Sequence, residues 1–457
     1  MIESLRRLVL EYGAAIAPLL RKGAWAVTDQ GLFAGANFLV NILLARWMTP
    51  VEYGAFTVAY STFLFAGVIH TGIFTEPMLV FGSGRFKKVF NSYLRILIWG
   101  HGGFSIIGTA LLGGAALWLR YAGAPVLASA LLGLTLAQPF ILFLWLMRRA
   151  PYVHHQPRRA ALAGTVYLGV LITLVFGVHH YASVSSLLVL LAMGGASFAA
   201  GLCIVRCFDL RVFSRISMSL LNSATRAHWN YGRWSVANNL LTWVPANAYF
   251  LLLPIWGDLG DSGALKALKN LIMPILHING AFAVLLVPEL VKVRSEGRFW
   301  NLVAIALALF VGGAGVYWLI IGLFGAELTA LLYGGQYAEY TSLLWLLGSV
   351  GVLGGITTVL SAALRAIESP QWIFWAYVLS SVVTLTIGVV CLALWALQGV
   401  IIAEVLTALA TVVGLVLAWN ALRKTEDFHK TQKMQSVELD GPDAPVQGAD
   451  RRREPSE

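Results

Sequence analysis

Charged side chains are scarce in this sequence, and cysteines are scarcer still. Only 12% of the 457 residues are charged, whereas 58% are hydrophobic, and the mean hydropathy is +0.75. A water-soluble core cannot hide that much apolar surface, so the composition excludes an ordinary soluble globular protein. The three cysteines, Cys203, Cys207 and Cys391, lie within or at the ends of apolar segments and are too few for a disulfide framework.

The sequence also lacks the motifs that catalysis commonly requires. It contains no GxSxG, no phosphate-binding P-loop and no HExxH. We therefore expect neither enzymatic activity nor a bound cofactor. Residues 1–22 are basic and lack the compact apolar core and the small-residue cleavage site of a signal peptide, which predicts a retained cytoplasmic arm.

Long apolar runs fill most of the chain. A transmembrane helix needs about 20 consecutive apolar residues, and segments of that length recur between charged or turn-rich breaks. The predicted spans are 24–48, 54–81, 92–119, 125–147, 160–179, 184–205, 230–256, 264–291, 299–323, 340–364, 371–395 and 399–420. The predicted fold class is an all-α integral membrane protein with about twelve transmembrane helices.

Basic residues test this arrangement independently, because short cytoplasmic loops hold most Lys and Arg. Most of the Lys and Arg fall in alternate loops and in both terminal segments. The opposite loops carry mainly acids: Glu52, Asp258, Asp261, Glu327 and Glu339. The pattern predicts both termini in the cytoplasm and a location in the cytoplasmic (inner) membrane.

Breaks in composition divide the chain into five parts. We predict a cytoplasmic arm at 1–23, a six-helix lobe at 24–206, a cytoplasmic interfacial linker at 207–228, a second six-helix lobe at 229–420 and a disordered cytoplasmic tail at 421–457. The two lobes are expected to enclose a central cavity.

A short echo between the two halves supports an internal duplication. Six residues separate Trp47 from Gly54-Ala55-Phe56, and six residues separate Trp256 from Gly263-Ala264-Leu265. Both stretches follow the first helix of a six-helix set, which is where a duplicated bundle would place them.

The stretch 44–56, LARWMTPVEYGAF, resembles the end of the first helix in the polysaccharide transporter family. That family includes flippases of O-antigen and other lipid-linked oligosaccharides, and it lies within the superfamily of multidrug and toxin extrusion antiporters. Pro50 fixes the turn and Gly54 allows close packing of the next helix. The resemblance implies two six-helix lobes facing a central cavity; one departure is Glu76-Pro77, where the family pattern has neutral small residues.

Amides recur along the first span. Gln30, Asn37 and Asn41 share one helical face, which predicts a polar lumen with Asn37 and Asn41 as substrate-binding residues. The alternative is that these amides hydrogen-bond between helices and serve packing only.

Lysines form a second stripe, in the eighth span. Lys266 and Lys269 lie on one helical face, and if they face inward they suit the fixed negative charge of a polyprenyl diphosphate. Arg233 and Arg46 could extend this basic track. The alternative is that both lysines extend to the membrane interface.

Carboxylates inside spans are candidates for ion coupling. Asp29 and Glu76 are predicted to exchange H+ or Na+ with the aqueous phases, or else to pair structurally with Arg46 or Arg95. Glu289 and Glu404 are expected to be solvated near span ends. His101, alone on an apolar face, is expected to be a core or hydrogen-bonded histidine.

We predict a flippase for lipid-linked oligosaccharide that works by alternating access. Its partners are the lipid-linked substrate, membrane lipids, and glycosyltransferases and a polymerase of the same pathway; no nucleic acid is expected. One alternative is an antiporter of drugs or cations with the same fold, whose cavity would be net acidic. The other is a non-transporting membrane scaffold for glycan synthesis.

Overall fold

The computed structural model describes residues 25, 28–208, 217–294 and 298–439, and in this part of the chain the regular structure is entirely helical. The first lobe begins with a helix at 28–47. Its other elements are α2 (Pro50–His70), η1 (Thr71–Thr75), α3 (Glu76–Ser83), η2 (Lys87–Val89), α4 (Phe90–Tyr121), α5 (Pro125–Val153), α6 (Pro157–Tyr181) and α7 (Ser186–Val205).

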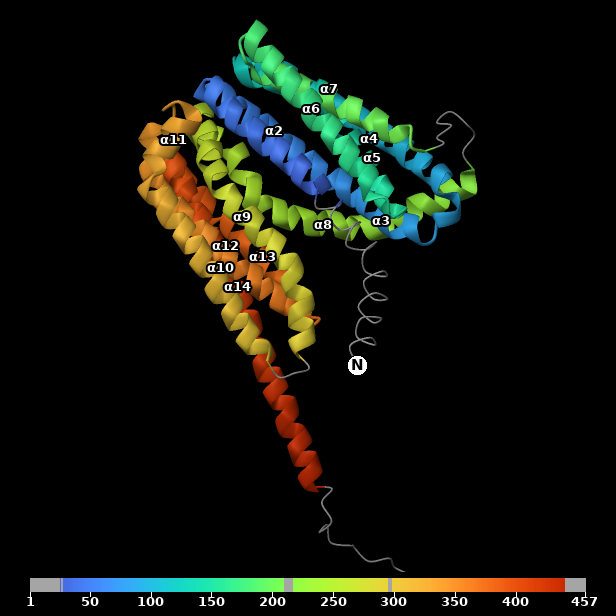
Figure 1. Cartoon of the computed structure of the whole chain (residues 1–457), viewed down its shortest axis with the longest axis vertical. Helices are drawn as coiled ribbons and strands as arrows, with labels where there is room; N and C mark the ends of the chain where they lie inside the picture. Colours follow the sequence, from blue (N-terminus) through green and yellow to red (C-terminus); the bar gives the residue numbers. More distant parts are fainter. Residues whose placement is uncertain (1–24, 26–27, 209–216, 295–297, 440–457) are drawn as a thin grey trace, which may run out of the picture.

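The second lobe repeats the pattern with a longer first helix. Its elements are α8 (Met218–Trp256), α9 (Leu259–Arg294), α10 (Phe299–Leu323), α11 (Gly325–Tyr333), η3 (Ala338–Leu343), α12 (Leu344–Ala366), α13 (Gln371–Leu385) and α14 (Ile387–Leu439). In Figure 1, α2 and α4 to α7 gather on one side and α9 to α14 on the other, while α8 runs from one group to the other. The sequence therefore folds as two helical lobes, as expected.

Nine helical segments in the described residues are long and apolar enough to cross a membrane. The helix at 28–47, α8 and the stretch that begins with α13 supply the remaining crossings, so the fold contains about twelve transmembrane helices. α8 carries many polar side chains, and α13 is only 15 residues long, which explains why composition alone identifies them less clearly. A positive φ at Ala396 separates the last two spans within α14.

Two helices extend across boundaries that the sequence suggested. α8 is continuous from Met218 to Trp256, so no break separates the end of the predicted linker from the seventh span. α14 continues as a helix to Leu439, within the predicted disordered tail, because 423–439 contains no Gly or Pro and many good helix formers. The predicted arm at 1–23, linker residues 209–216 and tail residues 440–457 lie outside the described residues.

The lobes meet at one end of the bundle. We call it the acidic end, because Glu52, Asp258, Asp261 and Glu327 lie there, and we call the opposite end the basic end. At the acidic end α2 packs along α9. A methyl group on Gly54 would overlap the Leu259 carbonyl oxygen, and one on Gly263 would lie 2.6 Å from the Pro50 carbonyl oxygen. The two echoed sequences thus touch each other, with backbone against backbone.

Hydrogen bonds reinforce this junction. Arg46 Nη1 donates to the Leu331 carbonyl oxygen at 2.9 Å, and Gln336 Nε2 donates to the Arg46 carbonyl oxygen at 2.8 Å. Deeper in the bundle, Asn270 Nδ2 of α9 donates to the Tyr53 hydroxyl of α2 at 3.0 Å. The acidic end of the structure is therefore closed by contacts between the lobes.

Substituting Gly54 tests the closeness of this contact. Gly54→Ala places a Cβ against the Leu259 backbone, which cannot move aside as a flexible side chain can, so we expect a loss of about 1–3 kcal/mol of stability. Thermal unfolding of the purified protein in detergent measures it. Gly102→Ala in α4, where nothing lies within 4 Å, is the matched control; equal melting temperatures for both variants would contradict the contact.

Candidate transport cavity

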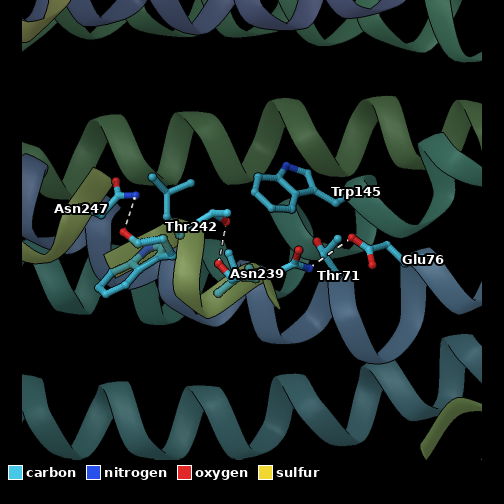
Figure 2. Close-up of a pocket in the computed structure, with 10 residues that line it drawn as sticks. Thr71, Glu76, Trp145, Asn239, Thr242 and Asn247 are labelled. Atoms are coloured by element: carbon cyan, nitrogen blue, oxygen red, sulfur yellow. Dashed lines mark hydrogen bonds between the residues drawn. The ribbon is translucent and has the colours of Figure 1, made fainter. Parts of the chain in front are cut away.

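A cavity of about 330 Å³ lies between the lobes. The first lobe contributes side chains from α2, η1, α3 and α5, and the second lobe contributes one face of α8. The lining residues are Leu64, Gly67, Val68, Thr71, Glu76, Trp145, Asn239, Thr242, Trp243 and Asn247. Figure 2 shows Glu76 and Thr71 on one side of this space, with Asn239, Thr242 and Asn247 following α8 along it. The lining contains a carboxylate, hydroxyls and amides.

Glu76 is held by the opposite lobe. Ser235 Oγ donates to one carboxylate oxygen of Glu76, and Asn239 Nδ2 donates to the other at 3.2 Å. Both donors belong to α8. The partners are neutral, so the structure brings together neither Glu76 and Arg46 nor Glu76 and Arg95 as an ion pair. Arg149 of α5 is within electrostatic reach of Glu76.

Proline explains the backbone next to Glu76. Pro77 has no N–H to donate to the Ile73 carbonyl four residues earlier. The helix widens into the π-helical turn η1 directly before Glu76 and Pro77. The Ile73 carbonyl oxygen instead accepts a hydrogen bond from His228 Nδ1 of α8, at 2.6 Å. His228 Nε2 in turn accepts from the Tyr93 hydroxyl at 2.5 Å. The proline thus creates an acceptor that ties α8 to the first lobe.

Asp29 lies in a buried ion pair within the first lobe. Arg148 Nε lies 2.7 Å from Asp29 Oδ1, the Tyr152 hydroxyl donates to Oδ2 at 2.6 Å, and Asp29 is fully buried. The prediction of Arg46 or Arg95 as its partner is wrong. The sequence predicts Arg148 in the loop after the fourth span, but α5 extends to Val153 and carries Arg148 into the lobe. The geometry describes a structural clamp between the first helix and α5.

The asparagines of the first helix bond to tyrosines. Asn37 Oδ1 accepts from the Tyr167 hydroxyl of α6 at 3.2 Å, and Asn41 Oδ1 accepts from the Tyr53 hydroxyl at 3.4 Å. Each amide also donates to its own helix, to a carbonyl four residues earlier. The arrangement matches the packing alternative, since both side chains are engaged in hydrogen bonds between helices.

The two lysines of α9 point into the protein. Lys266 Nζ lies 5.9 Å from the ring centre of Tyr60 in α2 and 5.6 Å from that of Phe250 in α8, which places it between the lobes. Lys269 Nζ lies 2.5 Å from Glu404 Oε1 of α14, and Glu404 is 7% exposed. The expectation of a solvated Glu404 is wrong, because the ion pair draws its carboxylate inward.

A second cavity, of about 250 Å³, adjoins Glu404. Its polar lining includes Ser380, Thr407, Thr411 and Tyr377, and it shares Thr242 with the first cavity. Ala246 also lines it, and the Ala246 carbonyl oxygen accepts a hydrogen bond from Lys269 Nζ at 3.3 Å. The two cavities are therefore neighbours along α8, one beside Glu76 and the other beside the Lys269–Glu404 pair.

The remaining predicted site residues lie elsewhere. Arg233 lines an apolar cavity of about 400 Å³ between α4 and α8, and Arg46 lies at the acidic end, so the structure does not bring either arginine to the lysines. His101 is buried and its Nδ1 lies 3.1 Å from His70 Nε2, which confirms a core, hydrogen-bonded histidine.

Sequence reasoning missed the α8 side of the cavity. Ser235, Asn239 and Thr242 recur at spacings of four and three residues, which places them on one face of a helix. The same search for polar stripes that selected the asparagines of the first helix would have found them. The role of Glu404 in an ion pair was missed, because its position near a span end does not indicate Lys269 as a partner.

The fold is shared with solved transporters. An inward-facing multidrug resistance MATE family transporter of the MOP superfamily has a TM-score of 0.69, with 14% identity over 88% of this chain and 99% of that one. The lipid II flippase MurJ, in an inward closed conformation, has a TM-score of 0.67, with 15% identity over 87% of each chain.

A third similar structure is a MOP superfamily transporter from Pyrococcus furiosus, described as having a binding pocket of reverse polarity. Its TM-score is 0.60, with 14% identity over 89% of this chain and 95% of that one. No protein-family model and no curated protein sequence matches the chain. At these identities the likeness establishes the fold alone: the chain is an integral membrane protein with the fold of the MOP superfamily transporters.

The Asp29 clamp gives a prediction about stability. Asp29→Asn leaves the Arg148 guanidinium buried without its counter-charge, which costs about 3–5 kcal/mol when such a pair is broken on one side. We expect a much lower yield of folded protein and a lower melting temperature, measured in detergent. The exposed Glu289→Gln is the control. A fully stable Asp29→Asn protein would contradict the structural role.

Proposed function

We propose that the chain is an alternating-access transporter that flips a lipid-linked oligosaccharide, a polyprenyl-diphosphate sugar, across the cytoplasmic membrane. The one observation that carries this proposal is the net positive charge on α9, where Lys266 faces Tyr60 of the first lobe and Lys269 pairs with Glu404 of α14. Lys266 and Lys269 supply two positive charges, and Glu404 supplies one negative charge. Lys266 has no carboxylate partner among the described residues, so one positive charge remains uncompensated.

An uncompensated cation within the membrane is costly, about 2.5–3.5 kcal/mol on insertion scales. An anionic substrate would remove that cost by pairing with it, whereas a cationic drug would add to it. Tyr60 and Phe250 beside Lys266 provide aromatic faces that partly compensate the ammonium while the site is empty. The likeness to a lipid II flippase is consistent with a substrate that has a lipid tail.

Orientation follows from the charge of the loops. With the basic end in the cytoplasm, the closed acidic end faces outward, and the cavity beside Glu76 lies on the side where lipid-linked sugars are assembled. Glycosyltransferases and a polymerase of polysaccharide biosynthesis are then the expected partners. The substrate head would move along α8, from Glu76 towards the lysines, while its tail stays in the bilayer.

One observation favours a second function, antiport of organic cations. The residues that line the cavity between the lobes include Glu76 and two amides but no lysine or arginine. A carboxylate in such a cavity can attract a cation or exchange a proton. We rank this function second because Ser235 and Asn239 already donate hydrogen bonds to Glu76, whereas Lys266 pairs with no carboxylate in the described part of the chain.

Removing the Lys266 charge tests the first function. In liposomes, flipping of a polyprenyl-diphosphate N-acetylglucosamine can be followed by its accessibility to an external lectin. We expect Lys266→Gln to slow flipping about tenfold or more, because the uncompensated charge is lost. Lys88→Gln in η2, an exposed lysine, is the control. Equal rates for a folded Lys266→Gln protein and the wild type would reject the basic site.

Glu76 separates the first function from the second. We expect wild-type liposomes with an imposed proton gradient to show no transport of ethidium, and Glu76→Gln to change nothing in that assay. Proton-driven ethidium transport that Glu76→Gln abolishes would establish antiport instead. If neither lipid-linked sugar nor ethidium moves, and all charge changes at the cavity are silent, a non-transporting scaffold is the better description.

A further inference from the structure

The Lys269–Glu404 pair occupies an unusual position for a structural ion pair. It lies between α9 and α14; Glu404 lines the 250 Å³ cavity, and the Lys269 side chain keeps 22% of its surface exposed. Glu404 is the more enclosed partner, with 8% of its side chain exposed. An anion that approaches the pair therefore meets more exposed surface on the lysine than on the carboxylate.

We propose that Glu404 is a proton-coupling group: an anionic substrate binds Lys269 in place of Glu404, and Glu404 then takes up a proton. This inference rests on the proposed function and adds to it the means of coupling. The contact between Lys269 Nζ and Glu404 Oε1 breaks, a contact between Lys269 Nζ and a phosphate oxygen forms, and a proton from the aqueous phase joins the carboxylate.

Charge balance supports the exchange. The empty site holds two lysines and one carboxylate, a net charge of +1, whereas a diphosphate linked at both ends carries one negative charge on each phosphate. If Glu404 stayed ionised, the occupied site would carry an excess negative charge inside the membrane. With Glu404 protonated, the two ammonium groups match the two phosphates. A monophosphate linked at both ends needs no proton, because its single charge already matches the empty site.

The surroundings of Glu404 suit a neutral carboxyl group as well as a paired one. The titratable groups that face it are Lys269 of α9, Tyr249 of α8 and Tyr377 of α13, with Lys266 one turn from Lys269. Hydroxyls of Ser380, Thr407 and Thr411 line the same cavity. Once Lys269 and Lys266 each pair with a phosphate, the remaining neighbours are neutral, so protonation of Glu404 is the remaining way to avoid an isolated buried charge.

Calorimetry counts the protons directly. Binding of farnesyl-diphosphate N-acetylglucosamine to the purified full-length protein is measured at pH 7 in two buffers of different ionisation enthalpy. This ligand has no group that titrates near neutral pH, so any proton exchanged belongs to the protein. We expect the wild type to take up about one proton per ligand and Glu404→Gln to take up none. We also expect none when the wild type binds farnesyl-phosphate mannose.

The pH dependence provides a second readout. Around neutral pH the wild-type affinity should fall about tenfold for each pH unit of increase, because one proton is bound with each ligand, while the affinity of Glu404→Gln stays constant. Glu289→Gln, an exposed carboxylate change, should behave as the wild type. If Glu404→Gln is unstable, Lys269→Gln/Glu404→Gln removes both partners together, which buried pairs commonly tolerate, and it should also take up no proton.

The outcomes separate this inference from the proposed function. Wild-type binding of the diphosphate without proton uptake, or equal uptake by Glu404→Gln, overturns the role of Glu404 and leaves a lipid-diphosphate transporter intact. Failure of the wild type to bind either lipid-linked sugar overturns the proposed function and this inference with it.

Discussion

The need to pair charges inside the membrane governs the interior of this protein. Lipid offers no water to solvate an ion, so each buried charge requires a partner from another helix. Asp29 and Arg148 join the first helix to α5, and Lys269 and Glu404 join α9 to α14. Lys266 departs from this rule among the described residues, and it lies where the two lobes face each other. A membrane protein that leaves one cation uncompensated at such a place has room for an anion that is not part of the chain.

The two ion pairs differ in what surrounds them, and so in what they can do. The Asp29 carboxylate is fully buried and accepts from both Arg148 and Tyr152, with no cavity lining residue among these partners. The Glu404 carboxylate lines a cavity, and its partner retains exposed surface. The same chemistry of carboxylate and cation therefore serves rigidity in the first lobe and exchange in the second. Position relative to a cavity, and not residue type, distinguishes the two roles.

Much of the fold followed from the sequence, because hydropathy and loop charge act over whole helices. The positions of the spans and the division into two lobes agree with the helices observed, and the echoed glycines proved to be the contact between lobes. The partners of the buried charges did not follow from the sequence. The sequence predicts Arg148 in a loop, because a charge usually ends a span, yet α5 continues to Val153 and carries Arg148 to Asp29. The position of Glu404 near a span end predicts a solvated carboxylate, whereas its partner Lys269 lies 135 residues away in sequence. Pairings of this kind depend on how helices pack, which residue spacing along one helix does not encode.

The hydrogen bond between His228 and the Ile73 carbonyl oxygen favours the conformation in which α8 packs against the first lobe. A carbonyl can only accept, so this bond places a hydrogen on Nδ1 and fixes one tautomer of the neutral imidazole. If α8 moved away from the first lobe, the Ile73 carbonyl oxygen would lose its His228 donor and Pro77 could not replace it, and an orphaned buried acceptor costs about 1–3 kcal/mol. Pro77 thereby favours the conformation in which α8 contacts the first lobe. A conformation with α8 farther away would require water to hydrogen-bond the Ile73 carbonyl oxygen instead.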